Sequence, residues 1–309
     1  MDINNKNLGC LFQRKYYDGL TLKQYGDDDE KRKAQKDYFE KQNRILIDAS
    51  KVCVEEENQL AKGIDNHLNF CLQTTYPGLI TGVGMVHATG MQGEIKFGFS
   101  FDYTSGLPVI SGSSVKGLLR SMFPFPPNKR PKTQEEKMAI SKQLTEKRVF
   151  IKEKLKKIKP VNLSNNEIDS LLIEDIDDFA KDIFEDGKLK KQALLPSGHR
   201  DKNLYDVYDR DVFFDAQIKG DYRKKGFLSI DYITPHKDEL ENPTPIQFLK
   251  ILPNVKFIFH FRLNDCILRS GKIIRKEDKL NLFKEILTTI GIGAKTNVGY
   301  GQLKECMEK

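Results

Sequence analysis

The stretch KEDKLNLFKEILTTIGIGAKTNVGYG, residues Lys276 to Gly301, is the part of this 309-residue chain that best indicates its fold. Its first half has apolar residues at helical spacing, so a helix over 276–289 is predicted. The apolar face of that helix would consist of Leu280, Phe283, Leu287 and Ile290. The second half is rich in glycine and predicts a loop. The chain then enters a strand-like end, so the stretch reads as helix, loop and strand.

A second helix is predicted near residues 112–123, because serines that can cap a helix precede apolar residues at helical spacing. A Pro-rich loop is predicted over 235–253. Short apolar or alternating runs predict strands at 70–76, 79–86, 94–101, 211–218, 226–233 and 256–263. Strands interleaved with two principal helices fit an α+β fold of the β-α-β-β-α-β kind.

Residues 1–66 are predicted to form an N-terminal helical extension. Tyr38, Ile45, Ala49 and Val52 recur there at helical spacing, in a segment rich in charged residues, glutamine and alanine. These four side chains are therefore expected to form the apolar face of an amphipathic helix.

Two oppositely charged segments follow the helix near 112–123. Lysine and arginine dominate residues 129–159, whereas aspartate and glutamate dominate residues 167–186. Apolar residues at helical spacing within the acidic segment predict a helical insertion over about 129–195, inside a domain that spans 67–309. The opposite charges can partly neutralise each other. The basic segment could meet RNA or protein, although a solvated helix face is the commoner case.

Composition limits the classes of function. Lysine and arginine number 51 against 44 acidic residues, and the net charge of +7 suits a polyanionic partner, although it is moderate for this length. The five cysteines include no Cys-x-x-Cys pair, so reduced thiols are expected rather than disulfides or a zinc site. No stretch approaches the roughly 18 apolar residues of a membrane span, and no signal peptide is evident. A cytoplasmic location is expected.

The glycine-rich loop does not match the nucleotide-binding motifs. In a P-loop comparison Thr289 stands where the first glycine is needed, and Ala294 stands before Lys295 where the second is needed. In a dinucleotide-binding comparison Gly291 and Gly293 fit, but a threonine occupies the third glycine position. No nucleotide cofactor is therefore predicted.

A nucleic-acid strand is a better ligand for this loop. Glycines let a backbone approach a ligand closely, side-chain donors can bind phosphate or sugar, and a tyrosine offers a stacking face. The candidate residues are Gly291, Gly293, Lys295, Thr296, Asn297, Gly299, Tyr300 and Gly301. The alternative is a glycine-rich turn that only packs between helix and strand.

The start of the helix near 112–123 is a second candidate. Ser113 and Ser114 stand at its N-terminus, where free N–H groups can bind phosphate, and Lys116 and Arg120 lie one turn apart on one face. The alternative is a plain capped helix with a solvated side.

Together these segments resemble the RAMP superfamily of CRISPR-associated proteins. The matching residues are Pro108-Val-Ile-Ser-Gly-Ser-Ser-Val-Lys-Gly-Leu-Leu-Arg120 and the glycine segment Gly291 to Gly301. Three further pieces, TGVG at 81–84, DVFFD at 211–215 and DYITPH at 231–236, are similar to the sixth-subunit family of Cmr-type (type III-B) effector complexes. The likeness runs from about residue 68 to the end. One departure is Ser111, where that family usually has a proline.

The resemblance implies an RRM-like, ferredoxin-like core. It also implies a capping position near the 3′ end of a guide RNA, beside a target RNA and next to backbone and small subunits. In that family the repeated backbone subunits cut the target with a loop aspartate. No nuclease centre, cofactor or metal is therefore expected in this chain.

Three other functions remain open from the residues alone. A metal-free ribonuclease would need a general base, and His236, followed by His87, is the best candidate, although a lone histidine after proline is more often structural. A metal site is weakly indicated, because the histidines lack ligand spacing and Asp211, Asp215 and Asp231 could be solvated strand ends. The third alternative is a purely protein-binding scaffold.

Overall fold

The predicted β-α-β-β-α-β core is present, and its six elements follow in the expected order. The structure is a computed structural model that describes residues 7–21, 26, 28–55, 63–84, 89–127, 131–184, 211–234 and 245–306. The core elements are β2 (His67–Thr74), α3 (Gly112–Met122), β5 (Ala216–Asp221), β8 (Lys256–Arg262), α7 (Lys276–Ile290) and β11 (Leu303–Glu305).

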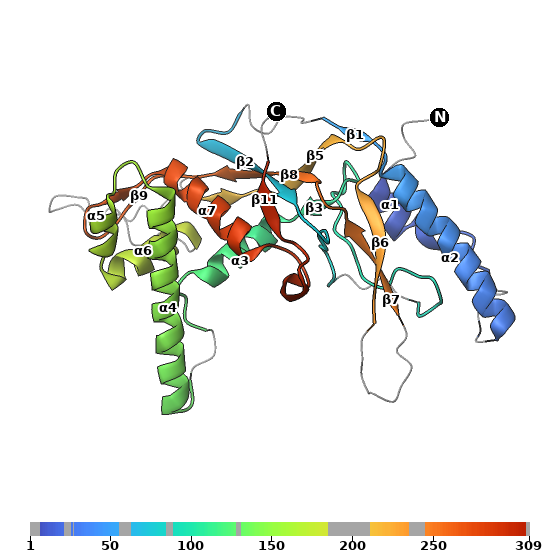
Figure 1. Cartoon of the computed structure of the whole chain (residues 1–309), viewed down its shortest axis with the longest axis horizontal. Helices are drawn as coiled ribbons and strands as arrows, with labels where there is room; N and C mark the ends of the chain where they lie inside the picture. The colour runs from blue at the N-terminus through green and yellow to red at the C-terminus, as the bar shows by residue number, and fades with distance from the viewer. Residues whose placement is uncertain are drawn as a thin grey trace, which may run out of the picture.

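The four core strands form an antiparallel sheet in the order β5-β8-β2-β11. The first and third core strands are therefore neighbours at the centre, and the second and fourth lie outside them, which is the ferredoxin-like arrangement. Phe70 on β2 stands opposite Phe259 on β8, and their rings stack. Helices α3 and α7 lie against one face of the sheet (Figure 1), where apolar residues from both form the core. The α+β prediction is confirmed.

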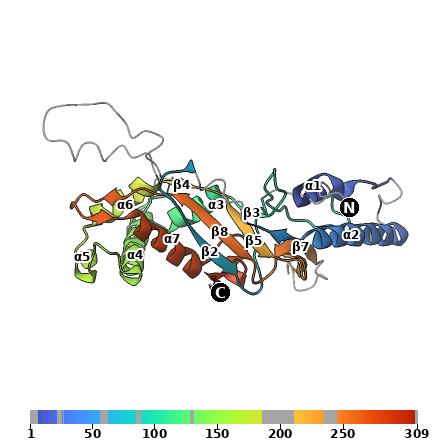
Figure 2. The ribbon, with the colours of Figure 1, turned by 90° about the horizontal axis from the view of Figure 1, so that it is seen from above.

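Short strands extend this sheet, and two separate ribbons accompany it. The extensions are β1 (Cys53–Val54), β3 (Val109–Ile110) and β4 (Val212–Phe213), which pair with β5, β5 and β8. The ribbons are β6 (Leu228–Ile233) with β7 (Ile246–Ile251), and β9 (Cys266–Ile267) with β10 (Ile273–Ile274). Viewed from above, the core strands run diagonally between the N-terminal helices at one end and α4–α6 at the other (Figure 2).

The N-terminal extension contains α1 (Leu8–Gln13), a short 3-10 helix (Lys15–Tyr17) and α2 (Asp29–Ala49). The helix is as expected, and three residues of its predicted apolar face, Tyr38, Ala49 and Val52, are partly buried and pack against the core. Phe39 and Leu46 are buried, whereas Ile45 is 39% exposed. The prediction thus failed at Ile45 and did not name Phe39 and Leu46, which are the more deeply buried positions of the helix. The buried side carries Asn43, which accepts a hydrogen bond from the Tyr16 hydroxyl and donates to the Gly93 carbonyl.

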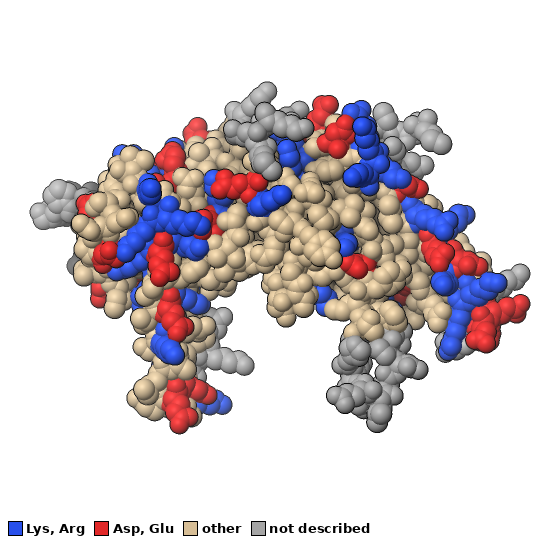
Figure 3. Space-filling view, viewed as in Figure 1, with Lys and Arg blue, Asp and Glu red and all other residues tan. Residues whose placement is uncertain are grey.

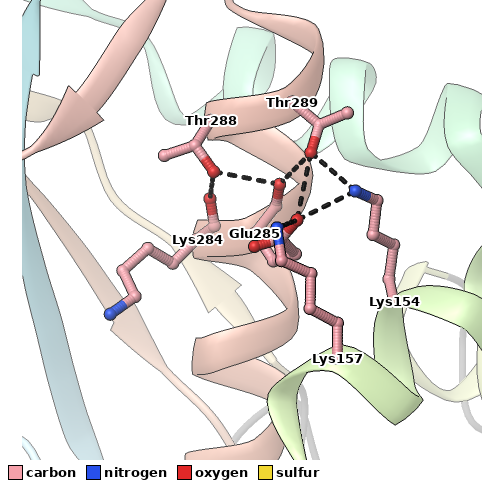
Figure 4. Close-up of polar contacts among 6 residues, drawn as sticks. All are labelled: Lys154, Lys157, Lys284, Glu285, Thr288 and Thr289. Atoms are coloured by element: carbon pink, nitrogen blue, oxygen red, sulfur yellow. Dashed lines mark hydrogen bonds and ion pairs between the residues drawn. The ribbon is translucent and has the colours of Figure 1, made fainter.

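The charged insertion forms α4 (Gln134–Ile158), α5 (Asn165–Asp169) and α6 (Ile173–Phe184). The expected neutralisation takes place between the two segments: Arg148 on α4 binds both carboxylate oxygens of Asp177 on α6 at 2.9 and 2.8 Å. Lysines of α4 also bind the core. Lys154 and Lys157 both reach Glu285 of α7, at 2.8 and 2.7 Å (Figure 4). Ion pairs therefore fasten the insertion to the core helix.

Three predictions of local structure are wrong in part. Residues 79–84 and 94–101 contain no strand, only isolated bridges at Leu79 and Phe101. Positive φ at Gly82 interrupts the first of these segments, and its remainder, 85–88, lies outside the described residues. Strand β7 begins inside the predicted Pro-rich loop, whose residues 235–244 also lie outside the described residues.

The expectation of five reduced cysteines is wrong, because Cys71 and Cys306 form a disulfide with their Cα atoms 5.7 Å apart. Spacing along the chain could not reveal it, since 235 residues separate the two. Antiparallel pairing of β11 with β2 sets Glu305 opposite Leu72, and this register brings the next pair, Cys306 and Cys71, together. None of the helices within the described ranges is long and apolar enough to cross a membrane.

Candidate nucleic-acid interface

Backbone hydrogen bonds hold the glycine-rich loop, residues 291–301, in one conformation. Its neck is closed by the bond from the Ile292 N–H to the Gly301 carbonyl, at 2.8 Å. Its sides are fastened to the segment after β2: the Ala294 N–H donates to Ile80, and the Gly301 N–H donates to Gly78. The loop between α7 and β11 is therefore held by backbone hydrogen bonds both within itself and to the segment after β2.

Internal packing explains three of the four predicted loop glycines. A methyl group at Gly301 would overlap the Ile292 carbonyl oxygen, and one at Gly293 would overlap the Ile80 carbonyl oxygen. A methyl group at Gly291 would lie 2.7 Å from the Gly301 carbonyl oxygen. All three glycines also have positive φ, a conformation that residues with a Cβ atom rarely adopt. The packed-turn interpretation thus accounts for their identity without any ligand. Gly299 differs, since the nearest atom to its Cβ position is 3.5 Å away.

The exposed part of the loop is its tip. Lys295 has a left-handed conformation and precedes a short 3-10 helix, Thr296–Val298. Asn297 is exposed, and Thr296 and Lys295 are half-buried. The Lys295 ammonium lies 5.6 Å from the centre of the Phe97 ring, which favours the cation without neutralising it. The tip therefore offers a positive charge, a hydroxyl and an amide.

Tyr300 packs under the loop. Its hydroxyl donates to Asp231 on β6 at 2.7 Å, and Lys250 on β7 binds the same oxygen at 2.6 Å. Its ring meets Phe248 edge-on. Burial and the neighbouring Asp231 carboxylate raise the pKa of Tyr300. Burial acts to raise the pKa of Asp231, but the hydrogen bonds from Lys250 and Tyr300 outweigh it and hold that pKa below its usual value. Asp231 is thus the hydrogen-bond partner of Tyr300 and the ion-pair partner of Lys250, and not a solvated carboxylate at a strand end.

The N-terminus of α3 is already capped. Ser111, the departure from the family pattern, is the N-cap residue, and its hydroxyl accepts from the Ser114 N–H. Asp215 accepts from the Gly112 N–H at 2.7 Å. A carboxylate therefore occupies the first turn, where a phosphate was expected to bind, and it would repel one. The side chains of Ser113 and Ser114 remain exposed.

The two cations of α3 lie on aromatic rings. The Lys116 ammonium is 5.8 Å from the centre of the Phe213 ring, and the Arg120 guanidinium is 3.9 Å from that of Phe125. Lys147 of the insertion helix stands nearby: partial burial and the positive charge of Arg120 lower the pKa of Lys147. Sequence spacing gave no sign of this third cation, because it comes from another helix.

Helix α7 connects the two candidate segments. α3 and α4 both contact α7, and the glycine-rich loop begins where α7 ends. In the space-filling view the outline of the molecule is hollowed between the projecting helix α4 and the middle of the molecule (Figure 3).

Two further features were missed because they depend on pairing between distant segments. Lys279 of α7 is buried, and its ammonium binds Asp211 at 2.7 Å and Asp182 of α6 at 3.3 Å. Asp211 is therefore an internal ion-pair partner, contrary to the expectation of a solvated strand end. The second feature is a hydrogen bond of 3.1 Å between the rings of His67 and His260 on β2 and β8.

The other three histidines of the sequence, His87, His199 and His236, lie outside the described residues. Within the described residues no three histidine, cysteine or acidic side chains are grouped so that they could hold a metal ion.

Comparisons with known proteins place the chain in a family. No curated protein matches it in sequence. One similar solved structure is a chain of a type III-B Cmr-beta complex bound to cognate target RNA, with 18% identity and a TM-score of 0.45 over 96% of this chain and 84% of that one. Another is Cmr6 from Pyrococcus furiosus, with 19% identity and a TM-score of 0.40 over 78% of this chain and 98% of that one. The RAMP superfamily model matches residues 71–304, which is most of the chain, and the protein therefore belongs to the RAMP superfamily.

Proposed function

We propose that this protein is a non-catalytic, guide-RNA-binding capping subunit of a type III-B CRISPR effector complex, which acts in antiviral defence by RNA-guided targeting of RNA. Membership of the RAMP superfamily supports the class of complex. The observation that carries the RNA-binding role is the braced glycine-rich loop. Its backbone is held by the segment after β2, while its tip presents Lys295, Thr296 and Asn297.

The proposal assigns a role to each candidate residue of the glycine-rich loop and of α3. Lys295 binds a phosphate, while Thr296 and Asn297 donate to phosphate or sugar. Lys116 and Arg120 bind the backbone through their side chains, because Asp215 already occupies the helix N-terminus. The exposed hydroxyls of Ser113 and Ser114 add donors, while Gly291, Gly293, Gly299, Tyr300 and Gly301 shape the loop. The partners are the 3′ region of the guide RNA, the target RNA and neighbouring Cmr subunits in the cytoplasm.

Charge reversal tests the proposal. The protein is co-expressed with the other subunits and the guide RNA, and the RNA bound to the purified complex is measured. The double substitution Lys116→Glu and Arg120→Glu should abolish this bound RNA. Lys33→Glu with Lys41→Glu is the matched control, because both residues are exposed on α2, which lies at one end of the molecule, away from α3 (Figure 2). The control should retain full RNA occupancy. RNA occupancy that stays normal in the Lys116 and Arg120 variant, with normal assembly, would overturn the proposal.

The alternative function is a RAMP-family endoribonuclease that acts on CRISPR RNA. Among the described residues, the His67–His260 pair is the observation that bears on it, since histidines can act as general acid and base. His67 begins β2, however, whereas the glycine-rich loop is fastened beyond the other end of that strand. His260→Ala should leave guide processing and target cleavage intact. Loss of cleavage in a normally assembled complex would favour the nuclease.

A further inference from the structure

Tyr76 is an exposed aromatic ring beside the glycine-rich loop. It follows β2, and its side chain is 85% exposed. Neighbouring residues on both sides of it contact the loop and its exit: the Thr75 N–H donates to the Gln302 carbonyl at 3.0 Å, and the Gly78 carbonyl accepts from the Gly301 N–H at 2.7 Å. The end of β2 and the loop therefore lie side by side (Figure 1).

The backbone that carries Tyr76 is firmly held. Before it, the Thr74 carbonyl accepts from the Asn254 N–H at 2.8 Å. After it, the Gly78 carbonyl accepts from the Gly301 N–H, and the Leu79 N–H donates to Ile251 of β7 at 3.0 Å. The Tyr76 ring is thus exposed to solvent on a backbone segment that hydrogen bonds hold in place. Little conformational entropy of the backbone would therefore be lost when a ligand covers the ring.

A second exposed apolar side chain, Val298, lies on the loop that faces the segment after β2. Val298 is 59% exposed and immediately precedes Gly299, whose Cβ position lies 3.5 Å from the Pro77 ring. Tyr76 and Val298 therefore bring apolar surface to the same tip that carries Lys295 and Asn297. Apolar surface combined with a cation and hydrogen-bond donors suits a nucleotide, whose base is flat and apolar on its faces and whose phosphate is anionic.

From this juxtaposition we infer that Tyr76 is a base-stacking residue, on which an unpaired base of single-stranded RNA lies while the loop tip binds the adjoining phosphate and sugar. The inference rests on the proposed RNA-binding function and adds a contact to it. Stacking needs a ring and no hydroxyl, is tolerant of base identity, and typically changes binding by about tenfold per base. It releases no counterions, so it should not alter the salt dependence of binding.

The test measures binding of the full-length protein to a fluorescein-labelled single-stranded oligouridylate by anisotropy, as a function of salt. Tyr76→Ala should weaken binding about tenfold with an unchanged salt slope, and Tyr76→Phe should bind as the wild type does. Tyr103→Ala is the matched control: Tyr103 is 87% exposed, but its turn packs against Asn7 beside α1. It should bind normally. The thermal midpoint of each variant should equal that of the wild type.

The outcomes separate the inference from the function on which it rests. If the wild type binds RNA and Lys295→Ala lowers the salt slope by about one, while Tyr76→Ala binds normally, the stacking role is wrong and the RNA-binding function stands. If Tyr76→Phe loses as much affinity as Tyr76→Ala, the hydroxyl and not the ring is responsible, and the inference also fails. Absence of any RNA binding by the wild type or by its assembled complex would overturn the proposed function itself.

Discussion

Replacement of Gly301 by alanine should destabilise the protein far more than the same replacement at Gly299. Both glycines have positive φ, of 73° and 96°, so alanine is disfavoured at each. Their surroundings differ: the new methyl group at Gly301 overlaps the Ile292 carbonyl oxygen, whereas at Gly299 the nearest atom is 3.5 Å away. The pair therefore separates backbone strain from a steric conflict inside the loop.

The expected magnitudes follow from these contacts. Backbone strain alone costs about 1–2 kcal/mol for alanine in the left-handed region, and this applies to both variants. To relieve the overlap, Gly301 must move away from Ile292, and its hydrogen bonds to Ile292 and Gly78 are then broken or weakened. Each contributes about 1 kcal/mol. Gly301→Ala should thus lose about 3–4 kcal/mol in total, and Gly299→Ala about 1–2 kcal/mol.

Urea unfolding measures the difference. The free energy of unfolding is extrapolated to water for the wild type and both variants, with the slope m compared to establish that the unfolded states are alike. Gly301→Ala should be less stable than Gly299→Ala by about 2 kcal/mol. Equal losses in the two variants would refute the conclusion that Gly301 is required by packing within the loop.

Three further predictions concern the ion pairs and the disulfide. Lys279→Met leaves Asp211 buried without its cation and should cost about 3–5 kcal/mol in urea unfolding. Glu285→Gln should cost about 1–2 kcal/mol at neutral pH. Burial acts to raise the pKa of Glu285, but Lys154 and Lys157 hold it below its usual value, so this difference should vanish as the pH falls through that lowered pKa, in unfolding followed against pH. Cys306→Ser should cost about 2–4 kcal/mol, and reducing agent should destabilise the wild type equally but not the variant.

Each of these predictions has a contradicting outcome. Lys284→Met is the control for Lys279→Met, because Lys284 lies on the same helix but is partly exposed; equal losses would show that burial of the Lys279 charge is unimportant. A Glu285→Gln deficit that persists in acid would exclude the ion pair as its source. A wild type that is insensitive to reducing agent would show that the disulfide adds no stability.

The elements of the core could be predicted because their signals are local. Apolar residues recur at helical spacing in α3 and α7, and the runs at β2 and β8 are rich in β-forming residues. The same local reasoning failed where several patterns fitted one segment. In α2 the predicted apolar face included Ile45, which is exposed, and left out Phe39 and Leu46, which are buried. The side of the helix that faces the core is set by contacts such as those of Asn43 with Tyr16 and Gly93.

The glycine-rich loop lies between a helix and a strand as predicted, but the sequence explained its glycines only in part. Glycine content marks the loop, yet the reason for Gly293 and Gly301 is contact with backbone atoms of distant or facing residues. Asp215 at the start of α3 and Asp231 beneath Tyr300 gave no sequence signal of their roles, since strand carboxylates are commonly solvated.

The sequence by itself determined the ferredoxin-like order of elements and the position of the glycine-rich loop, because helix and strand periodicity and glycine conformation are properties of neighbouring residues. Only the tertiary structure decided the pairing of Cys71 with Cys306, the burial of Lys279 between Asp211 and Asp182, and the exposure of Tyr76 beside the loop. Each of these depends on sheet register or helix packing, which bring together residues that are far apart in the chain.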